Sequence, residues 1–165
     1  MIAESAGPDS AVSKLIADNR ARFDQAMSEG VGYLDAQSGD EVGGVVAGII
    51  RHRAGGEIGV VNRGTLEAAF QEVVRPGPIT RGDVHLVIMT LRGDQVRSLY
   101  QRSERVQGQV GELFFAGVER RGAILVVNGR PLLNGEEYRV VASDFLAGGG
   151  DGHGEFRTGR HAKNL

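Results

Sequence analysis

The feature that most constrains the fold is a nearly continuous apolar run at residues 84–91, VHLVIMTL. A run of this kind is typical of a β-strand that is covered on both faces. Residues 57–61, 113–118, 123–127 and 138–142 are further short apolar segments that predict strands. Asn128-Gly129 follows one of them and is a strong hairpin-turn signal. The sequence therefore predicts a sheet with a deeply buried strand.

Helices are expected between these strands. In residues 11–26, the apolar positions recur at the spacing of one helix face, and residues 41–53 carry a similar stripe. Short helices are also expected at residues 65–73 and from Gly93 to about Val106. Because helices and strands mix without regular alternation, the predicted class is α+β, a single domain with a mixed β-sheet packed by helices.

Composition narrows the function classes. The 165 residues suit one domain, and a net charge of −2 argues against a nucleic-acid binder. No run of 18 apolar residues predicts a membrane span, and the first thirty residues lack the features of a signal peptide. Cysteine is absent, which excludes disulfides and thiolate metal sites. We expect a cytoplasmic protein that binds neither nucleic acid nor membrane.

The expected organisation has four parts. Residues 1–10 read as a flexible terminus, and 11–39 as an N-terminal helix and connector. Residues 40–157 form the folded domain, and 158–165 a polar tail.

The glycine-rich segment at residues 148–154 is the most informative stretch. Gly149 and Gly150 let backbone approach a ligand, and the Asp151 carboxylate can accept hydrogen bonds from ligand hydroxyls. Phe145, six residues before Asp151, offers a stacking face. A strained turn with a structural aspartate is the alternative, which composition alone favours. No Lys-Ser/Thr pair follows the glycines, so the segment is not a P-loop.

A second candidate is the turn Asn62-Arg63-Gly64, between a predicted strand and a predicted helix. Backbone amides at such a position can meet an anion, and Arg63 adds positive charge. An ordinary Asn/Gly turn is the commoner explanation.

Acid/base chemistry has one local candidate pair. Asp151 and His153 lie two residues apart and could form a general acid/base pair, although a solvent-exposed loop pair is the commoner arrangement. The four histidines have no metal-ligand spacing, so neither a metal nor a cofactor is expected.

Three segments in this order resemble a known family. GEIGVVNRGTLEAAF, ITRGDVHLVIMTLRGDQVRSLYQ and YRVVASDFLAGGGDG resemble the C-terminal domain of 5′-nucleotidases, over about residues 40–157. The resemblance implies the ligand-binding half of a two-domain enzyme, whose N-terminal metallophosphoesterase domain holds two metals and hydrolyses the phosphate. The GNHE motif of that catalytic domain is absent from these 165 residues. We therefore expect a divergent, stand-alone copy that is not a nucleotidase on its own.

The resemblance also implies roles for individual residues. Phe145 matches the aromatic that stacks on the base, and Asp151 the carboxylate that contacts ribose hydroxyls. Asn62 and Gly64 match residues beside the base and the phosphate. Glu67 departs from the pattern, because it stands where the family has a phosphate-facing arginine. That departure implies weakened phosphate recognition.

Two more departures concern whole segments. After Val84 the chain lacks the family's Pro-Phe-Gly-Asn loop, which supplies the second stacking wall. Residues 43–48, GGVVAG, lack the asparagine and aspartate of the family's Gly-Asn-Leu-x-x-Asp pattern. These losses imply a scaffold that is retained around an altered site.

Three functions remain open. The first is a non-hydrolytic domain for a nucleoside-like or other planar, hydroxylated ligand, and the second a metal-independent enzyme in bacterial specialised metabolism. Catalytic candidates for that enzyme are Glu67, His85, Asp151 and His153. The third is a binding subunit for a separate metallophosphoesterase, with the helix at residues 11–26 as the protein-partner surface.

Overall fold

The computed structural model describes residues 13–14, 17–22, 32–33, 39–66, 73–74 and 84–165. The chain divides into two compact units, residues 1–35 with 71–77, and residues 36–70 with 78–165. In the first unit, residues 13–14 and 17–22 are helical, and β1 (Gly32–Tyr33) pairs antiparallel with β3 (Val73–Val74). The rest of the expected helix at residues 11–26 lies outside the described residues.

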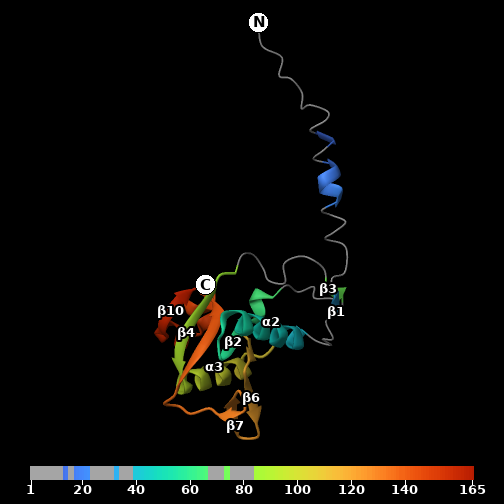
Figure 1. Ribbon diagram of the computed structural model, residues 1–165. Helices are drawn as coiled ribbons and strands as arrows, with labels where there is room; N and C mark the ends of the chain where they lie inside the picture. Colours follow the sequence, from blue (N-terminus) through green and yellow to red (C-terminus); the bar gives the residue numbers. More distant parts are fainter. Residues whose placement is uncertain (1–12, 15–16, 23–31, 34–38, 67–72, 75–83) are drawn as a thin grey trace. The chain divides into compact units, whose positions relative to one another are not determined.

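The second unit is built on a five-stranded mixed sheet of order β10-β4-β9-β2-β5 (Figure 1). Its strands are β2 (Ile58–Asn62), β4 (Leu86–Arg92), β5 (Leu113–Ala116), β9 (Glu137–Ser143) and β10 (Arg160–Asn164). The β2–β9 pair is parallel, and the other neighbours are antiparallel. The predicted α+β class with a mixed sheet is confirmed.

The apolar run at residues 84–91 forms β4, but its two faces are not equally covered. Val87, Met89 and Leu91 are buried, whereas the alternate residues are half-buried. The side chains of a strand alternate between faces, so one face of β4 supplies the main core and the other has partial cover. The expectation of a strand buried on both faces is corrected to that extent.

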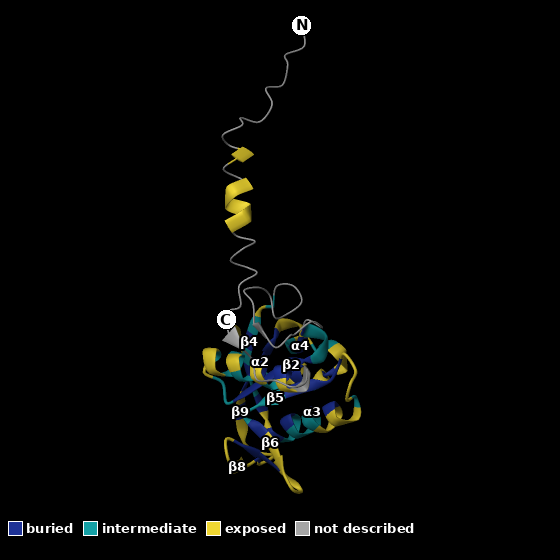
Figure 2. Cartoon of the chain, turned by 90° about the vertical axis from the view of Figure 1, so that its right-hand side faces the viewer, coloured by how far each residue is buried: buried dark blue, intermediate teal, exposed yellow. Residues whose placement is uncertain are grey.

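Two helices cover the sheet. The α2 helix (Gly39–Ala54) packs on β2 and β5, and α3 (Gly93–Arg105) packs on β4 and β5. Gly59 allows α2 to approach closely, because a Cβ atom there would overlap the Ala47 carbonyl oxygen. Its neighbours Ile58 and Val60 point to the opposite face, into the cluster that includes residues of α3. The buried residues therefore lie between helices and sheet (Figure 2).

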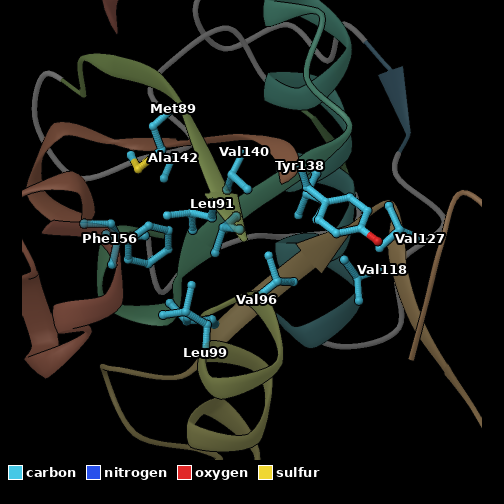
Figure 3. Close-up of a cluster of buried hydrophobic side chains, with 14 of the residues drawn as sticks. Met89, Leu91, Val96, Leu99, Val118, Val127, Tyr138, Val140, Ala142 and Phe156 are labelled. Carbon is cyan, nitrogen blue, oxygen red and sulfur yellow. The ribbon is translucent and has the colours of Figure 1, made fainter. Parts of the chain in front are cut away.

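The main core gathers side chains from β4, β9, α3 and the C-terminal segment (Figure 3). Met89 and Leu91 of β4, Val140 of β9, Leu99 of α3 and Phe156 all belong to this one buried cluster. This core supports α4 (Asp144–Ala147), η2 (Gly150–Gly152) and η3 (Gly154–Thr158), the elements that follow β9.

A small separate sheet holds β6 (Val118–Arg121), β7 (Ile124–Val127) and β8 (Arg130–Pro131). The predicted Asn128-Gly129 turn joins β7 to β8, and both residues have positive φ, as this turn type requires. The single strand expected at residues 113–118 is wrong. Gly117 has φ +85 and no room for a side chain beside the Glu57 carbonyl, so the chain turns there into a second sheet.

Two other expectations change. Of the helix expected at residues 65–73, residues 67–72 lie outside the described part. Thr65 ends a single 3-10 turn, η1 (Arg63–Thr65), Leu66 is extended, and residue 73 begins β3. The sheet also continues beyond residue 157, because β10, within the polar tail, pairs with β4. All five β10 residues are exposed, which suits a polar strand at the sheet edge. Within the described residues, no helix is long and apolar enough to cross a membrane.

Candidate functional site

Sheet topology brings four distant segments to one end of the second unit. Because β2 and β9 are parallel, their last residues, Asn62 and Ser143, lie at the same end. The antiparallel strands β4 and β5 begin at that end, where Leu86 pairs with Ser143 and Leu113 pairs with Asn62. The loops that precede or follow these strands therefore converge.

The loop after β9 is shaped by local hydrogen bonds. The Ser143 hydroxyl accepts a hydrogen bond from the Leu146 amide and so begins α4 as an N-cap. Gly149 then takes φ +82, and Asp151 takes φ +53, which is uncommon for a residue with a side chain. A Cβ atom on Gly150 would overlap the Phe145 ring. Glycine at position 150 is therefore what lets this ring lie against the loop.

Asn62 joins the turn after β2 to this loop. The Asn62 side chain is buried, and its Nδ2 donates a hydrogen bond of 2.8 Å to Asp151 Oδ2. The Thr65 hydroxyl donates to Asn62 Oδ1. The two candidate segments, the Asn62 turn and the glycine-rich loop, are thus joined by a hydrogen bond between residues 89 positions apart.

A cavity of about 390 Å³ opens between these segments. Its described lining residues are Asn62, Gly64, Thr65, Val84, Val110, Ser143, Asp144, Phe145 and Asp151. Phe145 is 51% exposed, so a face of its ring remains available to a ligand. Of the predicted binding residues, Asn62, Gly64, Phe145 and Asp151 line the cavity, while Gly149 and Gly150 shape the loop behind it.

Arg63, the residue expected to meet an anion, is not among the described lining residues. Its Nη2 lies 2.8 Å from Glu112 Oε2, and its guanidinium sits 5.1 Å from the centre of the Phe114 ring. The ion pair and the aromatic face hold the side chain away from the cavity. Within the described lining, the ionisable side chains are the carboxylates Asp144 and Asp151.

The catalytic candidates do not form one cluster. His85 is exposed, with its Nδ1 3.7 Å from Asp144 Oδ2. His153 is fully buried, and its Nε2 lies 2.7 Å from the Gly111 carbonyl oxygen. The expectation of a solvent-exposed Asp151–His153 pair is therefore wrong for His153, because this ring packs inside the domain, edge-on to Phe156. Glu67 lies outside the described residues.

Comparison with known families and structures decides the classification. The family model "5'-nucleotidase, C-terminal domain" matches residues 21–158. This chain belongs to the 5′-nucleotidase C-terminal domain family. No curated protein matches its sequence.

Solved structures show the same fold for this 5′-nucleotidase C-terminal domain. A 5′-nucleotidase precursor from Thermus thermophilus aligns with TM-score 0.64 and 19% identity, over 97% of this chain and 38% of that one. A putative 5′-nucleotidase from Staphylococcus aureus, in complex with alpha-ketoglutarate, aligns with TM-score 0.65 and 11% identity, over 99% and 40%. The NAD nucleotidase of Haemophilus influenzae gives TM-score 0.57 and 19% identity, over 90% and 28%. This chain thus spans two fifths or less of each.

One wall of the site in this 5′-nucleotidase C-terminal domain was missed by sequence reasoning. Val110, in the loop before β5, lines the cavity, and its carbonyl accepts a hydrogen bond of 2.9 Å from the Gly64 amide. The Glu112 carbonyl likewise accepts from the Arg63 amide at 2.8 Å. No local sequence signal marks this loop, because only the β2–β5 pairing places it beside the Asn62 turn. Within the described residues, no group of three His, Asp or Glu side chains could hold a metal ion.

Proposed function

We propose that this chain binds an uncharged, nucleoside-like ligand in the cavity between Asn62 and Asp151, without hydrolysing it. The observation that carries the proposal is the Asn62–Asp151 hydrogen bond. It joins the turn after β2 to the glycine-rich loop, and both segments line one cavity beside Phe145. A volume of about 390 Å³ lies within the range of small-molecule sites, which begins near ~300 Å³.

The lining offers two complementary contacts. The half-exposed Phe145 ring can stack on a planar base, a contact that contributes about 1–3 kcal/mol. Asp151 uses Oδ2 for Asn62, whereas its Oδ1 makes no hydrogen bond to any residue in the described part of the chain. That oxygen can accept hydrogen bonds from ligand hydroxyls such as those of a ribose.

Charge argues for a ligand without phosphate. The ionisable side chains in the described lining are the carboxylates Asp144 and Asp151, and the nearby Arg63 is paired with Glu112. A phosphate monoester would be repelled by the two carboxylates. We expect nucleosides to bind more tightly than the corresponding monophosphates.

A thermal-shift panel of nucleosides, nucleoside monophosphates and free bases, with and without Mn²⁺, tests the proposal. Because stabilisation follows RT ln(1 + [L]/Kd), each ligand is titrated to several millimolar, so that a millimolar binder is detected. Nucleosides should raise the melting temperature, and a 5′-phosphate should reduce the shift. The absence of a shift with every nucleoside would contradict the proposal.

Two glycine variants make a matched pair for this panel. Gly150→Ala places a methyl group against the Phe145 ring and displaces it, so nucleoside affinity should fall about tenfold. Gly154→Ala adds the same methyl group where nothing lies within 4 Å, and affinity should not change. If the two variants bound nucleosides with equal affinity, Phe145 would not be part of the binding site.

A metal-independent enzyme is the second candidate. The observation that favours it is the approach of His85 Nδ1 to within 3.7 Å of Asp144 Oδ2, because Asp144 also lines the cavity. Such a pair can transfer a proton to or from a bound small molecule. Chromatographic detection of product from any member of the panel without metal, and its loss in His85→Ala, would favour this candidate over simple binding.

A further inference from the structure

His153 occupies a position that its place in the glycine-rich loop does not suggest. The side chain is fully buried, behind the cavity rather than in its lining. Its Nε2 lies 2.7 Å from the Gly111 carbonyl oxygen. Because a carbonyl can only accept, Nε2 carries the hydrogen and donates it. Nδ1 is buried and has no hydrogen-bond partner in the described part of the chain.

Gly111 lies between the two halves of the candidate site. On one side, the adjoining Val110 carbonyl accepts from the Gly64 amide at 2.9 Å. On the other side, a Cβ atom on Gly111 would lie 3.2 Å from the Asp151 Cβ, so the two backbones are nearly in contact. The loop before β5 is therefore packed between the Asn62 turn and the glycine-rich loop.

Three hydrogen bonds connect these segments in a closed ring. Asn62 bonds to Asp151, Gly64 bonds to Val110, and His153 bonds to Gly111. The first two involve residues that line the cavity, and the third lies behind them. Removal of the His153 bond would open the ring without removing any group that faces the cavity.

We propose that His153 is a positioning residue for the ligand site, which fixes Asp151 and Val110 relative to each other through Gly111. The inference rests on the proposed function of the cavity. Asp151 holds φ +53, and Gly152 holds φ +79. Backbone in sparsely populated regions persists only when its surroundings hold it there. The buried His153 bond, two residues beyond Asp151, provides such a restraint.

Two amide variants test the hydrogen bond itself. In His153→Gln, the side-chain amide nitrogen can reach the position of Nε2 and still donate to Gly111. In His153→Asn, the amide ends near the position of Nδ1 and leaves the Gly111 carbonyl without its donor. An unpaired buried carbonyl should weaken adenosine and uridine affinity about tenfold in the Asn variant, whereas the Gln variant should stay within about threefold of the parent chain.

Melting temperatures of both variants separate positioning from general damage. The expected result is a similar loss of thermal stability in the two variants and a loss of nucleoside affinity in the Asn variant alone. Equal affinity in the Asn variant and the parent chain would overturn the proposal. An affinity loss in both variants, in proportion to their loss of stability, would also overturn it.

NMR gives a readout that needs no ligand. In the parent chain, the ¹⁵N shifts of His153 should show a hydrogen on Nε2, and the Gly64 amide should exchange faster with solvent in His153→Asn than in His153→Gln. A hydrogen on Nδ1 alone would overturn the inference even if the Asn variant does not fold. If the parent chain binds neither nucleoside, the proposed function fails, and these NMR measurements alone decide the role of His153.

Discussion

Glu155 shows how one half-buried carboxylate couples the stability of this domain to pH. Its Oε1 accepts a hydrogen bond of 2.6 Å from the Ser98 hydroxyl, and its Oε2 is buried without a hydrogen-bond partner in the described part of the chain. Burial alone would raise the pKa of Glu155. The Ser98 hydroxyl, a backbone hydrogen bond and the positive charge of Arg102 outweigh it and lower the pKa below the usual 4.5.

Because the pKa of Glu155 is lowered in the folded state, the free energy of unfolding should decrease at acidic pH. The folded state favours ionised Glu155, so its contribution to stability is present above the unfolded-state pKa, near 4.5, and is lost as pH falls through the lower folded-state value. We expect Glu155→Gln to lower the free energy of unfolding by about 1 kcal/mol at pH 7 and to flatten its decline below pH 4.5. Urea titrations across the pH series measure both effects.

The exposed variant Glu119→Gln is the control for Glu155→Gln, because Glu119 pairs with Arg121 at the surface. Such surface pairs contribute little to stability. If the free energy of unfolding fell equally below pH 4.5 in the parent chain and in Glu155→Gln, Glu155 would not be the cause of this part of the pH dependence.

At the scale of the elements, the contact between α2 and β2 depends on a residue without a side chain. A Cβ atom on Gly59 would overlap the Ala47 carbonyl oxygen of the helix backbone, which cannot rotate away. Gly59→Ala should therefore lower the free energy of unfolding by about 3 kcal/mol, as α2 is forced from the sheet. Chemical denaturation followed by circular dichroism measures this loss.

Gly44→Ala is the matched change on the same helix. Nothing lies within 4 Å of a Cβ atom at Gly44, and alanine favours a helix interior by up to about 1 kcal/mol over glycine. We therefore expect this variant to be slightly more stable than the parent chain. If the two glycine variants proved equally stable, close packing of α2 on β2 could not be what requires glycine at position 59.

Elements with strong local signals could be predicted from the sequence, and those set by tertiary packing could not. The α3 helix has a stripe of apolar residues on one face, β9 has a short apolar run, and Asn128-Gly129 is a turn dipeptide. All three elements form as expected. The break at Gly117 depends on an approach to the distant Glu57 carbonyl, which has no local signal. A polar edge strand such as β10 has no buried apolar face, so the sequence of the tail contains no apolar alternation that would predict a strand.

The candidate site shows the same difference between features with a local sequence signal and features set by long-range packing. The resemblance indicated Asn62, Phe145 and Asp151, and these residues line one cavity because the parallel β2–β9 pair brings the strand ends together. The direction of Arg63 and the burial of His153 depend instead on Glu112 and Gly111, residues that have no motif of their own. The topology therefore explains the convergence of the site, and long-range contacts decide which side chains face the cavity.

At the whole-molecule scale, binding and hydrolysis should be separable in this chain. The GNHE motif of a metallophosphoesterase does not occur in the 165 residues, and the described residues hold no group of three His, Asp or Glu side chains that could hold a metal ion. Metal-assisted hydrolysis needs such a group to hold the ions. The proposed function is binding without hydrolysis, and on that proposal we expect no phosphate release from adenosine monophosphate with added Mn²⁺, in a preparation that adenosine stabilises against heat.

A colorimetric phosphate assay on the purified chain measures this, with heat-denatured protein as the blank. Asp151→Asn is the informative variant, because asparagine tolerates the positive φ of this position and keeps an oxygen for the Asn62 amide. The variant should bind adenosine more weakly, since it replaces a charged hydrogen-bond acceptor with a neutral one. Phosphate release that exceeds the blank and falls in Asp151→Asn would place hydrolysis in this cavity and contradict the proposed separation of binding from catalysis.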